Sequence, residues 1–163
     1  MAIRGTGEGE EGTIYNVKRT VFFLSAFFIV FLFSLQTAFA QVHVRMRVIL
    51  ASNAGQEIDP SLRDVHKELG SLFSFTSYRL IRDESLNLSL NQPIRITGRT
   101  GKAFLEATLV GLHRNMAELR LRVVREGTEI LNTQVRLFAG RTVFVGGPRY
   151  GEGVVIYALY GNF

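Results

Sequence analysis

Three histidines are the first side chains in this sequence that could bind a metal ion or transfer a proton. His43, His66 and His113 are far apart along the chain, and none stands at the short spacing that is typical of metal ligands. Cysteine is absent, which excludes thiolate catalysis, cysteine-bound zinc and iron–sulfur clusters. We therefore expect no metal, no cofactor and no catalytic residue.

The carboxylates and serines support the same expectation. Asp83 and Glu84 are adjacent, and we expect them in a solvated turn between two strands, where they would not form the separated acid and base pair of a glycosidase. No Gly-x-Ser-x-Gly segment is present to mark a serine nucleophile. An enzyme of another type would need titratable side chains gathered around one of the histidines, and this is the third alternative for the function.

A glycine-rich segment, residues 146–153, is the most distinctive local feature of the chain. It reads Gly-Gly-Pro-Arg-Tyr-Gly-Glu-Gly and has the pattern of neither a Walker loop nor a dinucleotide-binding turn. It is either a plain connection between strands or a loop that presents arginine and tyrosine, which are favoured interface residues, to a partner. The candidate contact loop comprises Gly146, Gly147, Pro148, Arg149 and Tyr150.

Arginine dominates the charge of the chain beyond residue 40. That part has 16 basic and 11 acidic side chains, and 14 of the basic ones are arginines that alternate with apolar residues. No basic run exceeds two residues, so we expect no nucleic-acid partner. The arginines form either a solvated sheet surface or a binding surface for an anionic lipid, a glycan or an acidic protein. The candidate basic face comprises Arg45, Arg47, Arg120 and Arg122.

The N-terminal part has the three features of a bacterial export signal. Lys18 and Arg19 precede an uncharged, phenylalanine-rich run over 21–35, and Ala38-Phe39-Ala40 follows it. We predict a signal peptide over 17–40, cleaved between Ala40 and Gln41, and a periplasmic or secreted protein of the bacterial envelope.

Two further expectations concern this end of the chain. The uncharged stretch 20–40 just reaches the roughly 20 residues of a membrane span, so an uncleaved inner-membrane anchor is the alternative to cleavage. Residues 1–16 are acidic and rich in glycine, which is unusual ahead of an export signal. They are either disordered or not translated, since Val17 read from a GTG codon would begin an ordinary signal peptide.

Residues 41–163 are expected to form a single β-rich domain. Apolar and polar side chains alternate over 42–50, which is typical of a half-buried strand. Asp59 and Pro60 are suited to begin a short helix of about ten residues, and Gly70 to end it. Further strands are expected over 75–82, 85–91, 93–97, 102–112, 117–125, 130–138, 141–145 and 153–160, and the short links between them, Ala139-Gly140 included, predict antiparallel hairpins.

The fold class is therefore mainly β, bordering on α+β. We expect an antiparallel β-sandwich or a strongly curled sheet of eight or nine strands. The one short helix would lie on the sheet and cover an opening, because so short a helix is marginal without tertiary packing.

One segment resembles a known family. Residues 132–148 include Gly-Arg-Thr-Val-Phe-Val-Gly-Gly, which is similar to a hairpin of the secretins, the outer-membrane channels of type II and type III export systems and pilus machines. In that family the hairpin belongs to the membrane-embedded channel. The match covers 17 of the 163 residues, and the 123 residues after position 40 are too few for a secretin with its ring domains. The resemblance implies a small accessory protein of such a channel.

The sequence thus favours a non-enzymatic binding or assembly module in the cell envelope, with an envelope protein as its partner. The alternative is a carrier or sensor of an anionic lipid or glycan, which would use the arginines and a pocket under the helix.

Overall fold

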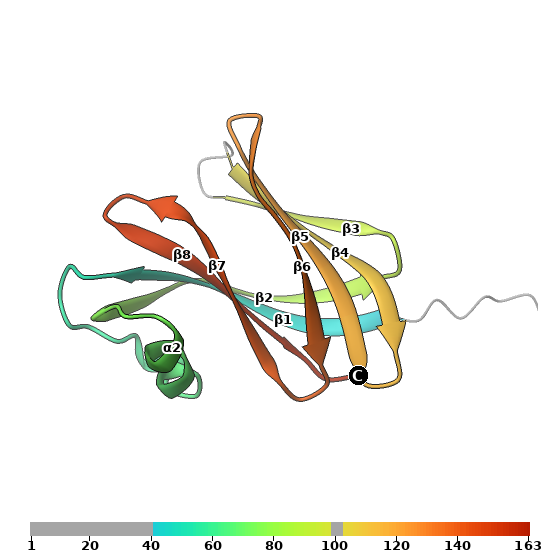
Figure 1. Ribbon diagram of the computed structural model, residues 1–163, viewed down its shortest axis with the longest axis horizontal. Coiled ribbons are helices and arrows are strands. Elements are labelled where there is room, and N and C mark those ends of the chain that lie inside the picture. The colour runs from blue at the N-terminus through green and yellow to red at the C-terminus, as the bar shows by residue number, and fades with distance from the viewer. Residues whose placement is uncertain (1–40, 99–102) are drawn as a thin grey trace, which may run out of the picture. The chain divides into compact units, whose positions relative to one another are not determined.

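The computed structural model describes residues 41–98 and 103–163, and within them the predicted β-sandwich is confirmed. The predicted signal peptide with Ala38 and Ala40, and the segment 1–16, lie outside the described residues. The elements are β1 (Gln41–Ser52), the 3-10 helix η1 (Pro60–Leu62), α2 (His66–Leu72), β2 (Ser77–Ser89), β3 (Pro93–Thr97), β4 (Ala103–His113), β5 (Met116–Arg125), β6 (Thr128–Phe138), β7 (Thr142–Tyr150) and β8 (Gly153–Gly161). Eight strands form two antiparallel sheets (Figure 1): sheet A has the order β2-β1-β8-β7, and sheet B the order β3-β4-β5-β6.

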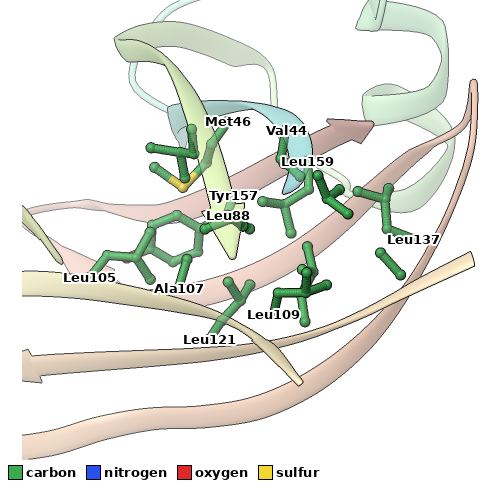
Figure 2. Packing of buried hydrophobic residues seen from close by; sticks show 14 of the residues in the cluster. Val44, Met46, Leu88, Leu105, Ala107, Leu109, Leu121, Leu137, Tyr157 and Leu159 are labelled. Atoms are coloured by element: carbon green, nitrogen blue, oxygen red, sulfur yellow. The ribbon is translucent and has the colours of Figure 1, made fainter. Parts of the chain in front are cut away.

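Alternating apolar side chains place the main core between the two sheets. Val44 and Met46 of β1 and Leu119 and Leu121 of β5 are completely buried, and they belong to one cluster. Figure 2 shows side chains of both sheets, among them Met46 and Leu121, meeting in this layer. The intervening residues of β1 and β5 therefore point to the outer faces of their sheets.

Two short links carry the chain from one sheet to the other. The link Ala139-Gly140 was predicted to close a hairpin, and this prediction is wrong, because β6 belongs to sheet B and β7 to sheet A. The Gly140 N–H instead donates to the Gly161 carbonyl at 2.8 Å, and the Asn91 N–H, between β2 and β3, donates to the Leu109 carbonyl at 2.8 Å. These bonds hold the sheets together at one end, and the sheets diverge towards the β5–β6 and β7–β8 turns (Figure 1).

Strand β2 replaces two strands that the sequence suggested. Asp83 and Glu84 were predicted in a turn, but they lie inside β2, opposite Arg47 and Met46 of β1. The continuous ladder to β1 keeps this segment extended, and the register shifts only once, between Val48 and its neighbour Ile49. The acidic pair is therefore part of a sheet.

The helical region divides into η1 and α2. Asp59 caps η1 as expected, since its Oδ1 accepts from the Ser61 N–H at 3.0 Å, and Pro60 is the first residue. Gly70 does not end the helix, because α2 continues to Leu72. Tertiary contact sets that end: the Tyr78 hydroxyl donates to the Phe73 carbonyl at 2.6 Å.

The helical region lies on the outer face of sheet A, as predicted for so short a helix. Leu62, Val65 and Leu69 are buried against Ile49 and Ile156 in a second apolar cluster. These side chains fill the contact between the helical region and the sheet. No helix within 41–98 and 103–163 is long and apolar enough to cross a membrane.

Candidate functional site

The predicted contact loop is a bulged edge strand. Gly146, Gly147, Pro148, Arg149 and Tyr150 lie in β7, and only Gly151 and Glu152 form the turn. The prediction of a loop was wrong because β8 supplies partners on both sides of a bulge: Gly146 pairs with Ile156, and Arg149 with Val154. Pro148 lies in the bulge of an edge strand, where a missing N–H disrupts no ladder.

The tip of the β7–β8 hairpin borders a hollow of about 530 Å³ at the end of sheet A. Tyr150 stands at this hollow with 58% of its surface exposed. Three separate parts of the chain build the remaining walls: the end of β1 with the loop after it, the start of β2, and the β7–β8 turn. The lining residues used below are Glu57, Asp59, Arg79, Tyr150 and Glu152. We call this hollow the sheet-A hollow.

The charges around the sheet-A hollow are mostly uncompensated. The carboxylates of Glu57 and Glu152 and the guanidinium of Arg79 make no hydrogen bond or ion pair with any described residue. Asp59 is used structurally, because it accepts from Ser61, and these hydrogen bonds lower the pKa of its carboxyl group. With three carboxylates against one guanidinium, the lining carries a net negative charge.

The four arginines of the candidate basic face do not share a face. Arg45 and Arg47 point outward from β1 in sheet A, whereas Arg120 and Arg122 point outward from β5 in sheet B. The outward faces of a sandwich lie on opposite sides of it. The single basic face predicted from the sequence is therefore wrong, because strands of similar pattern belong to different sheets.

Three of these arginines are held by carboxylates. Arg45 Nε donates to Asp83 at 2.9 Å, Arg47 Nη1 to Asp64 at 2.8 Å, and Arg122 Nε to Glu106 at 3.3 Å. Hydrogen bonds from the arginines lower the pKa of both aspartates, and the bond to Asp83 raises the pKa of Arg45. Within the described part of the chain, Arg120 alone of the four has no ion pair. Three of the four arginines are therefore already paired with carboxylates of the same chain.

A second hollow, which we call the inter-sheet cleft, opens between β2 of sheet A and the β3–β4 pair of sheet B. Its volume is about 360 Å³, and Tyr157 of β8 lies in its lining with only 5% of its surface exposed. The Tyr157 hydroxyl has no hydrogen-bond partner among the described residues. Burial raises the pKa of Tyr157 to about 12, so the hydroxyl keeps its proton. Sequence reasoning missed Tyr157, although its position in the alternating pattern of β8 would have placed it inward.

The histidines occupy three different places. His43 Nδ1 is 2.7 Å from Asn87 Oδ1 on the outer face of sheet A, His66 begins α2 and contacts the Tyr78 ring, and His113 ends β4. Residues 41–98 and 103–163 contain no group of three His, Asp or Glu side chains able to hold a metal ion.

The sheet-A hollow and the inter-sheet cleft are the candidate binding sites.

Comparison with known proteins adds no relative. No protein-family model matches the chain, and no curated protein and no solved structure matches it either.

Proposed function

We propose that this chain is a non-enzymatic binding module of the bacterial envelope, which engages a protein partner at the sheet-A hollow. The observation that carries the proposal is the group of unpaired charges, Glu57, Glu152 and Arg79, beside the exposed ring of Tyr150. Tyrosine and arginine are common anchors of protein interfaces. Unpaired charges on a ready-made concave surface give specificity at little cost in reorganisation.

The net negative charge of the lining selects a partner segment with basic residues. A lysine or arginine of the partner would pair with Glu57 or Glu152, and an acidic residue would pair with Arg79. The bulge and Pro148 make pairing of a foreign strand to this part of β7 unfavourable, so side chains would dominate the contact.

The place of action is part of the same proposal. The basic, apolar and Ala-x-Ala segments before Gln41 support export to the envelope. The resemblance of residues 132–148 to a secretin segment makes a secretion or pilus channel the first class of partner to look for. In this chain β6 and β7, which hold that segment, belong to different sheets.

Site-specific photo-cross-linking in living cells tests the proposal. A photoreactive phenylalanine analogue at position 150 should give an adduct with one envelope protein, identified by mass spectrometry. The same analogue at Tyr160, also exposed but on the outer face of sheet A, is the matched control and should not give that adduct.

Charge reversal adds a second criterion. Glu152→Lys should weaken the adduct yield roughly tenfold, as a charge mismatch of about 1.4 kcal/mol implies, whereas Glu68→Lys on α2 should leave it unchanged. Equal adducts at positions 150 and 160, or an adduct insensitive to Glu152→Lys, would contradict the proposal.

A further inference from the structure

The inter-sheet cleft has a wall chemistry different from that of the sheet-A hollow. Its lining is mainly apolar, with side chains from both sheets: Val48, Ile81, Ile96, Leu105 and Val123. Ile81 is the bulged residue of β2, since Val48 pairs with Arg82 and Ile49 with Leu80. It leaves 42% of its surface exposed at this cleft, which is unusual for an isoleucine beside a core.

Two hydrogen-bond donors border these apolar walls. Only 5% of Tyr157 is exposed, and its hydroxyl has no partner among the described residues. No buried side-chain oxygen or nitrogen of these residues lacks a partner, so the Tyr157 hydroxyl is accessible, and the residue lines the cleft. Arg82 lies on the inward side of β2, as its pairing with Val48 shows, and lines the cleft. Its only described partner is Glu84, at 3.4 Å, and both side chains are about one-third exposed or more. An ion pair so long and so exposed is weak and can be exchanged.

We propose that the inter-sheet cleft binds a single-chain fatty acid, with the alkyl chain on the apolar walls and the carboxylate at Arg82 and the Tyr157 hydroxyl. The volume of about 360 Å³ is at the small end of ligand pockets and fits one chain of medium length. Both donors suit an oxygen acceptor, and the guanidinium suits a carboxylate in particular. This inference concerns a different site from the proposed protein interface and does not depend on it.

The ion pair of Arg82 with Glu84 predicts opposite effects of two substitutions on the affinity for a carboxylate. Because Glu84 competes for Arg82, Glu84→Gln should release the guanidinium and tighten carboxylate binding. Arg82→Gln should weaken it roughly tenfold or more, the effect of losing a charged hydrogen bond. A purely structural role for this ion pair would make both substitutions act in the same direction.

Dodecanoate added to the purified full chain below its critical micelle concentration is the direct test, followed by isothermal titration calorimetry. We expect one dodecanoate per chain, with weak or no binding of dodecyltrimethylammonium at the same concentration. Ile81→Trp, which fills the cleft, should abolish binding. Ile130→Trp, at a similarly exposed isoleucine on β6 outside the cleft, should not.

A second measurement covers the case in which Ile81→Trp does not fold. In the wild-type protein, methyl NMR signals of Ile81 and Ile96 should shift with dodecanoate, and those of Ile130 should not. Absent binding, equal affinity for the cationic amphiphile, or shifts confined to residues outside the cleft, such as the apolar run 21–35, would each overturn the proposal. Weaker dodecanoate binding with Glu84→Gln would overturn the assignment of the carboxylate to Arg82.

Discussion

Gly147 of β7 lies directly against the ring of Tyr157 on the neighbouring strand β8. A Cβ atom at Gly147 would come within 2.7 Å of Tyr157 Cε2 and 2.9 Å of the Val155 carbonyl oxygen. The glycine in the bulge thereby makes room for the large side chain of Tyr157, which lines the inter-sheet cleft. A residue first noticed as part of a contact loop is thus a packing residue of the interior.

Gly147→Ala should destabilise the protein by about 1–3 kcal/mol, because the added methyl group overpacks the interior against a ring and a backbone oxygen. Urea unfolding followed by circular dichroism measures this loss. Gly146→Ala is the matched control: its Cβ would meet only Phe73 Cε1, at 3.8 Å, so the change should stay below about 1 kcal/mol. Equal losses for the two variants would show that steric contact with Tyr157 is not the cause.

Asp64→Asn should lower the free energy of unfolding by about 1–2 kcal/mol. Arg47 is 5% exposed and would keep its charge without an ionic partner, and losing one member of a buried pair is costly. Asp64 itself is exposed, so water offsets part of the loss. Asp83→Asn, which breaks the more exposed pair with Arg45, should cost less than about 1 kcal/mol in the same assay. A larger loss for Asp83→Asn would contradict the importance of burial at Arg47.

The pair of Arg47 and Asp64 also predicts how stability depends on acid. The hydrogen bond from Arg47 lowers the pKa of Asp64 in the folded state, so the folded protein holds this carboxyl proton more weakly than the unfolded chain does. The stabilisation is complete above the ordinary aspartate pKa of about 4 and is lost as the pH falls through the lower folded value. The difference between the urea midpoints of the wild type and Asp64→Asn should therefore shrink as the pH is lowered from 6 to 2. A gap that stays constant down to pH 2 would refute this.

Tyr157 predicts a loss of stability at high pH. Its pKa is raised from 10.0 to about 12 by burial, so the unfolded chain releases this proton before the folded protein does. Stability from this group is intact below pH 10 and declines between pH 10 and 12. The phenolate absorbance of the wild type minus that of Tyr157→Phe, measured as a function of pH, should show one titrating group with a midpoint near pH 12. Melting temperatures of Tyr157→Phe should fall less steeply over this range.

The positions of most strands and the start of the helical region follow from local patterns in the amino-acid sequence. Alternation of side chains predicted β1 within two residues at either end, and Asp59 with Pro60 marked the first helical turn. Both signals are local: a period of two follows from the geometry of one extended strand, and a cap needs only the next few residues.

The pairing of the strands and the contacts of the surface residues depend on how the two sheets assemble. The sequence could not separate a hairpin link from the crossing at Ala139-Gly140, because both are short and contain glycine. It also grouped Arg45 with Arg120, because both arginines alternate with apolar residues along a strand. The two sheets place them on opposite outer faces. The partner of Asp83 is Arg45, which is 38 residues away in the chain, and the surroundings of Tyr157 come from the neighbouring strands. No local pattern in the sequence records such contacts. Pairing depends on contacts between distant segments, and these form only when the whole sandwich does.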